Sequence, residues 1–134
     1  FLFLYSDILF DPKIVDGLLK DKSNFCLAIK KYGLREEAEK VVEKNGIIEA
    51  VSKVNRGEKN GEFIGVVKFS DSGAKKLINE LNEIAKESIN SSLIEVIDRI
   101  IKKGEEISAY DIRDAKFIDI DFPEDLKKAE KIFG

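Results

Sequence analysis

Short runs of strand-forming residues alternate along this chain with segments whose apolar residues recur at helical spacing. Strands are predicted at residues 1–5, 25–29, 39–44, 47–53, 63–69, 107–110 and 117–120. Helices are predicted to begin at Asp11-Pro12, at Ser70-Asp71, at Leu93 and at Pro123. This order predicts an α/β fold with a mixed sheet, and the length of 134 residues predicts a single domain spanning 1–134.

The first five residues, FLFLY, form a continuous apolar run. Continuous apolar character is typical of a strand that is covered on both faces, as in a parallel sheet. A chain that opens on a central strand predicts neighbouring strands upstream, and the absence of methionine indicates a processed chain or a fragment. An edge left open at this strand would favour self-association.

Asn45-Gly46 separates two strand-like runs. Both positions of a tight hairpin turn need a positive φ, which Asn and Gly adopt most readily. The sequence therefore predicts a hairpin over 39–53.

The charge balance limits the possible partners. Lys and Arg number 23 against 26 Asp and Glu, so the net charge is -3, and an electrostatic nucleic-acid binder would instead show a basic surplus. The longest apolar run is far shorter than the ~20 residues that span a bilayer, so no membrane segment is expected.

Side-chain chemistry is restricted too. Histidine is absent, which excludes His-dependent nucleophile pairs and His-ligated zinc. One cysteine, Cys26, is expected to be a buried apolar side chain, and the cysteine count fits a reducing cytoplasmic location. Carboxylates remain, and they favour hard ions such as Mg²⁺ or Mn²⁺.

Three aspartates are candidates for such an ion. Asp7 follows the first strand, at the sheet edge where open α/β sheets bind ligands, although it could equally start a turn. Asp119 and Asp121 are two residues apart, so in a strand both would point to one face. Without further information a solvated strand face explains this pair better than a metal site.

Three other residues carry weaker signals. Lys53 ends the second hairpin strand, where most lysines are solvated. Glu62 opens the strand at 63–69, and Gly65 lies inside it; a strand glycine often marks close approach of a ligand or another backbone.

Several segments together resemble the sugar-nucleotidyltransferase-like NTP transferases. Residues 4–12 (LYSDILFDP) look like the strand-plus-acid segment, and 41–53 like the hairpin that ends in a lysine. Residues 61–70 (GEFIGVVKFS), 92–97 (SLIEVI) and 119–130 (DIDFPEDLKKAE) resemble three later segments of the same family, in the same order. The most similar subgroup is that of phosphocholine, inositol-phosphate and sugar-phosphate nucleotidylyltransferases.

The resemblance implies a three-layer mixed sheet flanked by helices, an incomplete nucleotide-diphospho-sugar transferase (Rossmann-like) fold. It implies a Mg²⁺- or Mn²⁺-dependent transfer of a nucleotidyl group from an NTP to a phosphorylated sugar or alcohol, with release of pyrophosphate. Asp7 and Asp121 would ligate the ion, and Asp119 would be a third acid. Lys53 would contact a phosphate, and Glu62 and the Gly65 backbone would line the acceptor pocket.

The family's Gly-rich loop, which cradles the NTP phosphates, is absent from these residues. The chain is therefore expected to be the acceptor- and metal-binding half of such an enzyme and to be inactive alone. Two alternatives remain open: a non-catalytic α/β module for small-ligand binding or assembly, and a phosphohydrolase with Asp7 as nucleophile. The second alternative expects an acid two residues after Asp7, where the sequence has Leu9.

Overall fold

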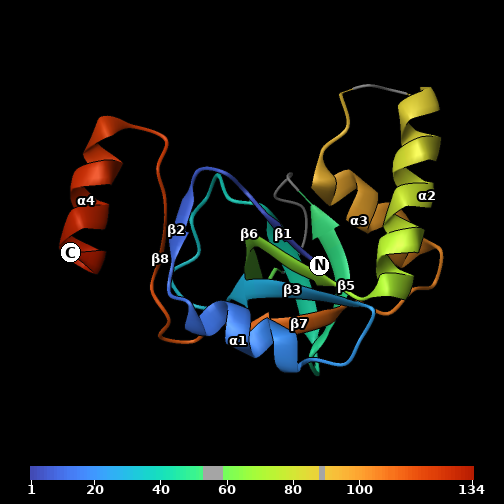
Figure 1. Cartoon of the computed structure of the whole chain (residues 1–134), viewed down its shortest axis with the longest axis horizontal. Coiled ribbons are helices and arrows are strands. Elements are labelled where there is room, and N and C mark those ends of the chain that lie inside the picture. The colour runs from blue at the N-terminus through green and yellow to red at the C-terminus, as the bar shows by residue number, and fades with distance from the viewer. Residues whose placement is uncertain (53–58, 88–89) are drawn as a thin grey trace.

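The computed structural model describes residues 1–52, 59–87 and 90–134 and has a six-stranded mixed sheet at its centre (Figure 1). In the order β1-β6-β3-β7-β5-β4, its strands are Leu2–Leu4, Gly61–Phe69, Phe25–Lys30, Ser108–Asp111, Ile47–Ser52 and Lys40–Lys44. The β3–β7 pair is parallel and the other strand pairs are antiparallel. The described ranges contain four helices: α1 (Lys13–Lys20), α2 (Asp71–Glu87), α3 (Leu93–Lys102) and α4 (Pro123–Phe133).

Helices cover both faces of the sheet, which confirms the predicted three layers (Figure 1). Successive side chains of β3 point to opposite faces of the sheet and so contribute to two different hydrophobic clusters. Phe25, Leu27 and Ile29 pack in the cluster under α2 and α3, whereas Cys26 and Ala28 pack in the cluster under α1. None of the helices in the described ranges is long and apolar enough to cross a membrane.

The predicted hairpin is confirmed. Strands β4 and β5 pair antiparallel, and the turn residues Asn45 and Gly46 have φ values of 52° and 82°. The turn therefore uses the positive φ that the Asn-Gly pair favours.

The predicted first strand forms, but within the described residues it lies at an open edge of the sheet and is not covered on both faces. Strand β1 pairs only with β6, antiparallel, and lies at an edge of the sheet. Its apolar side chains pack along this edge: the Phe1 ring stacks on Phe69 with 5.0 Å between centroids, and Phe3 meets Tyr5 edge-on. Leu4 is left 45% exposed, which agrees with the expectation that a strand without its neighbours exposes apolar surface.

A second, two-stranded sheet was not predicted. Strand β2 (Ile8–Phe10) pairs antiparallel with β8 (Phe117–Asp119), with Ile8 opposite Asp119. Figure 1 shows this ribbon between the main sheet and α4, at the end of the molecule away from α2 and α3. The pairing joins the beginning of the chain to its end, and this positions the acidic residues described next.

Candidate functional site

Asp7 and the Asp119–Asp121 segment lie side by side. The backbone N–H of Ile120 donates to the Asp7 carbonyl at 2.7 Å, directly beyond the β2–β8 pairing. Asp7, Asp119 and Asp121 all line one pocket of about 210 Å³. The structure therefore brings together the three aspartates that the sequence singled out, from the two ends of the chain.

The pocket is strongly acidic. Its walls comprise Tyr5, Asp7, Arg35, Glu37, Ala38, Glu39, Phe63, Ile64, Asp119 and Asp121. These are five carboxylates against a single cationic side chain, Arg35, among the described residues. Such a pocket favours a cation, because like charges at short range repel unless a positive charge lies among them.

Arg35, in the loop between β3 and β4, was missed by the sequence analysis. Its backbone N–H donates to Glu62 Oε2 at 2.9 Å, and its Nε and Nη2 donate to Glu62 Oε1 at 2.8 and 2.5 Å. Its Nη1 donates to Asp119, and the guanidinium carbon lies 5.3 Å from the centroid of the Phe117 ring. No local pattern distinguishes this arginine, because it stands in a charged loop that looks solvated in sequence.

Glu62 is fully buried, at 0% exposure. A buried carboxylate needs a charged partner, and Arg35 fills this role with three hydrogen bonds. The sequence-based expectation had Glu62 lining the acceptor pocket; the structure places its carboxylate behind Arg35, which itself lines the pocket.

Asp119 differs from the other two aspartates because it is ion-paired with Arg35. Burial raises the pKa of Asp119 above its ordinary value, although the hydrogen bond and charge of Arg35 act in the opposite direction. Among the residues the structure describes, no group of three or more acidic or cysteine side chains is arranged to hold a metal ion. Asp7 and Asp121 are thus the carboxylates of the predicted trio with no ion pair to Arg35.

The loop that carries Arg35 is held by a buried lysine. The Lys40 ammonium donates to the Arg35 carbonyl, and to the carbonyls of Glu36 and Ala38 at 3.3 and 3.2 Å. Lys40 is only 6% exposed, so these carbonyls replace water around its charge. In sequence it looks like an ordinary hairpin lysine.

Gly65 allows Tyr5 to lie close to the backbone of β6. The Tyr5 backbone N–H donates to the Gly65 carbonyl at 2.9 Å, and a Cβ at Gly65 would lie 2.5 Å from the Tyr5 ring. The φ of Gly65 is +81°, which also favours glycine. The Tyr5 hydroxyl, in turn, donates to Glu39 Oε2 at 2.8 Å in the pocket wall.

Burial raises the pKa of Tyr5 first, and the hydrogen bond to Glu39 and the charges of Glu39 and Asp7 raise it further. The phenol therefore stays protonated and remains a hydrogen-bond donor. Gly65 thus leaves the space that the Tyr5 ring occupies in the pocket wall.

Two further predictions concern Lys53 and Cys26. Lys53 lies outside the described residues. Cys26 is 1% exposed and burial raises the pKa of its thiol to about 12, which supports the buried apolar role expected for it.

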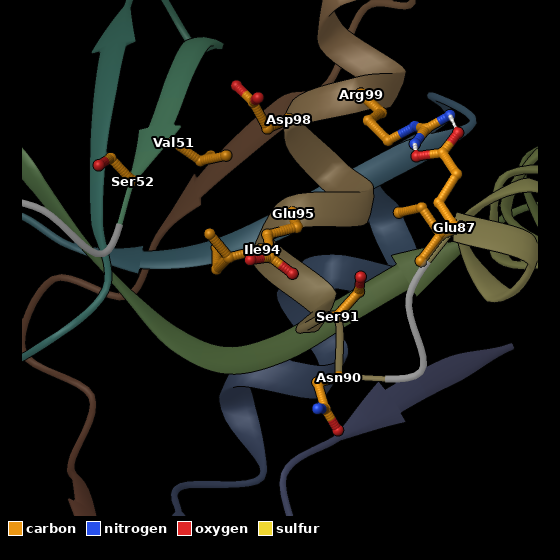
Figure 2. Close-up of a pocket in the computed structure, with 10 residues that line it drawn as sticks. Val51, Ser52, Glu87, Asn90, Ser91, Ile94, Glu95, Asp98 and Arg99 are labelled. Carbon is orange, nitrogen blue, oxygen red and sulfur yellow. Dashed lines mark hydrogen bonds and ion pairs between the residues drawn. The ribbon is translucent and has the colours of Figure 1, made fainter.

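A larger cavity, of about 540 Å³, lies between β5, α2 and α3 (Figure 2). Figure 2 shows Arg99 turned toward Glu87, with which it pairs at 2.7 Å. Of the predicted site residues that the structure describes, none lines this cavity. The smaller acidic pocket is therefore the candidate site.

Solved structures share this fold. The inositol-1-phosphate CTP transferase from T. maritima superimposes with a TM-score of 0.82 at 24% identity, over 98% of this chain and 54% of that one. A putative glucose-1-phosphate thymidylyltransferase from Bacillus anthracis superimposes with a TM-score of 0.75 at 12% identity. The match covers 98% of this chain and 53% of that one. The CTP:phosphocholine cytidylyltransferase from Streptococcus pneumoniae superimposes with a TM-score of 0.67 at 12% identity. The match covers 84% of this chain and 49% of that one.

The chain spans about half the length of these solved structures. No family model matches it, and no curated protein does. The structural similarity confirms the fold that the sequence motifs implied: this chain has the α/β fold of the nucleotidyltransferases, over about half of the length of those enzymes.

Proposed function

We propose that this chain forms the acceptor- and cation-binding half of a nucleotidyltransferase that joins an NTP to a phosphorylated sugar or alcohol and releases pyrophosphate. The observation that carries the proposal is the meeting of Asp7 with Asp121 in one pocket, through the hydrogen bond from Ile120 to the Asp7 carbonyl. The solved enzymes of the same fold, named for CTP and thymidylyl transfer to phosphorylated compounds, support this class of reaction.

The donor set fits Mg²⁺ or Mn²⁺. Asp7 and Asp121 would hold the ion, since Mg²⁺ commonly uses one or two carboxylates and completes its shell with water and substrate phosphates. The two carboxylates come from segments far apart in the sequence that the fold brings to one pocket. The ion would neutralise charge on the phosphates during transfer.

The chemistry is an in-line displacement. A phosphate oxygen of the acceptor attacks the α-phosphorus of the NTP, and the new P–O bond forms as the bond to the pyrophosphate leaving group breaks. In this reaction the chain would bind the acceptor and orient its phosphate at the pocket, where the carboxylates hold the divalent ion. Lys53 is proposed to contact a phosphate of the acceptor.

Cation binding by this chain tests the proposal. Mn²⁺ is titrated into the protein and free Mn²⁺ is measured by electron paramagnetic resonance. We expect Asp7→Asn and Asp121→Asn each to weaken Mn²⁺ binding about tenfold or more, because each removes one of two charged ligands. Asp114→Asn, which removes an exposed acid outside the pocket, is the matched control and is expected to bind as the unmodified chain does.

Equal Mn²⁺ affinity in the chain and in Asp121→Asn would contradict the proposal. That result would favour the alternative of a non-catalytic α/β module that uses the same fold for small-ligand or protein contact. Circular dichroism of each variant separates loss of a ligand from loss of the fold.

A further inference from the structure

A buried carboxylate anchors one side of Arg35. Glu62, fully buried, accepts from the backbone N–H, Nε and Nη2 of Arg35. A guanidinium has five N–H donors, and Nη1 lies at the end that Glu62 does not contact. The buried anchor fixes the plane of the guanidinium, so Nη1 points in a defined direction.

Packing supports the same orientation. The Phe117 ring lies 5.3 Å from the guanidinium carbon, and Lys40 holds the backbone carbonyl of Arg35. The side chain is nevertheless 36% exposed, and it lines the acidic pocket. Arg35 is therefore a fixed cation that a ligand in the pocket can reach.

Nη1 of Arg35 already has an anionic partner. Nη1 of Arg35 donates to one carboxylate oxygen of Asp119, which also lines the pocket. A carboxylate and a phosphate oxygen offer arginine the same kind of charge-assisted acceptor, and phosphate accepts two parallel N–H groups readily. Asp119 thus occupies the position where an anionic ligand group would bind.

We propose that Arg35 binds the phosphate group of a phosphomonoester acceptor, and that this phosphate replaces Asp119 as the partner of Nη1. The inference rests on the proposed function, because that function supplies a phosphorylated acceptor. The pocket wall carries five carboxylates and, among the described residues, this one cationic side chain. A dianionic phosphate needs a positive contact there besides the divalent ion, and Arg35 is placed to provide it.

Binding of methyl phosphate, the smallest phosphomonoester, tests the assignment. Calorimetric titration is done in excess Mg²⁺ on the chain and its variants. We expect Arg35→Gln to weaken methyl phosphate binding about tenfold or more, since it removes a charge-assisted contact. Asp119→Asn should tighten binding about twofold or more, because it removes the carboxylate that competes for Nη1.

Lys30→Gln is the matched control. Lys30 Nζ lies 6.0 Å from the centroid of the same Phe117 ring, but Lys30 lines a different cavity. This variant removes an equal charge nearby without touching the proposed contact. Its affinity for methyl phosphate should stay within about twofold of the unmodified chain.

Arg35→Gln leaves Glu62 buried without its partner and can fail to fold. The double variant Arg35→Gln/Glu62→Gln removes both charges of the buried pair and keeps two hydrogen-bonding amides. It should show the same loss of methyl phosphate binding with a cooperative melting transition. Arg35→Lys, which keeps the charge but not the planar fork, should recover part of the affinity.

Unchanged methyl phosphate affinity in the folded double variant would overturn the inference, as would weaker binding in Asp119→Asn or no binding by the unmodified chain. The two proposals fail separately. If Mn²⁺ binding depends on Asp7 and Asp121 while Arg35 variants bind methyl phosphate normally, only the inference fails. If the Arg35 variants lose methyl phosphate while Asp7 and Asp121 variants bind Mn²⁺ normally, the proposed cation site fails and the Arg35 assignment is supported.

Discussion

Single charged residues in the interior of this protein are each held by several polar partners. Lys68, in the all-buried strand β6, donates to the carbonyls of Asp21 and Ser23 at 3.0 and 2.6 Å and to the Asp21 carboxylate at 3.2 Å. Removing one partner of such a buried charge costs more than an ordinary hydrogen bond, because the group left behind stays desolvated. Lys68 therefore ties the loop between α1 and β3 to the sheet.

Asp21 should make the stability of the protein depend on pH in a defined way, and Asp21→Asn should remove that dependence. Burial disfavours the charged form of Asp21, but hydrogen bonds from Ser23 and Lys68 outweigh it, so the pKa of Asp21 lies below its ordinary value. A lowered pKa means that the ionised carboxylate stabilises the fold above the unfolded pKa, about 3.9, and that this stabilisation is lost as the pH falls through the folded pKa.

We expect Asp21→Asn to lower the free energy of unfolding at pH 7 by about 1–3 kcal/mol. The difference from the unmodified chain should shrink below about pH 4, where the Asp21 carboxyl of the unfolded chain takes up its proton, and should be lost as the pH falls through the folded pKa. Urea denaturation at pH 7, 5 and 3 measures it, with the exposed Asp114→Asn as control. A difference that is constant over this range would contradict the assignment.

At the scale of elements, one glycine decides how two strands meet. Gly65 lies in β6, and its backbone bonds that of Tyr5, which follows β1. The Tyr5 ring fills the space where a Cβ would stand and meets the Phe63 ring edge-on at 5.7 Å between centroids. The strand glycine therefore serves both the β1–β6 contact and the wall of the acidic pocket.

Comparing Gly65→Ala with Gly46→Ala separates two effects on stability, the cost of a positive φ and the cost of steric overlap. The two glycines have nearly equal φ values, +81° and +82°, but a Cβ at Gly46 has nothing within 4 Å. Gly46→Ala should lose about 1–2 kcal/mol of stability, the cost of a left-handed conformation. Gly65→Ala should lose a further amount of about 1–3 kcal/mol, because its Cβ overlaps the Tyr5 ring.

Denaturant unfolding of both variants measures the difference. Adding Tyr5→Ala to Gly65→Ala should remove most of the excess cost, since the ring is the source of the overlap. Equal losses in the two single variants would show that Tyr5 yields freely, and would contradict a close approach at this site.

For the whole molecule, the exposed edge at β1 is the feature with the widest consequence. In the described ranges β1 pairs with β6 alone, and Phe1 and Leu4 are 59% and 45% exposed. Unpaired edge groups beside apolar side chains favour pairing with another chain. The sequence-based prediction of self-association through the N-terminal strand therefore has a structural basis, and it stays a prediction.

Light scattering over a range of concentrations tests it. We expect the mass of this chain to rise with concentration, and Leu4→Lys to reduce that rise because a charge on an edge strand opposes pairing. Leu19→Lys, at a position on α1 that is 58% exposed, removes an apolar side chain of the same size away from β1 and is the control. A clean monomer at high concentration would contradict the prediction.

Local patterns in the sequence determined most of the elements. The Asn45-Gly46 turn, the helix starts and the buried strand around Cys26 depend on neighbours a few residues apart, and such contacts leave a periodic or turn signal. The motifs also predicted Asp7, Asp119 and Asp121 as candidate site residues, and the structure brings these three to one pocket.

The tertiary structure alone decided the β2–β8 ribbon and the partners of the charged residues. Arg35 meets Glu62, 27 residues away, and Asp119, 84 residues away. A charged side chain in a loop looks the same in sequence whether it is solvated or anchored, because apolar periodicity reports which faces are buried and carries nothing about which polar groups face each other. That pairing is set by how the sheets and loops pack, and it separates Asp119, bound to Arg35, from Asp7 and Asp121.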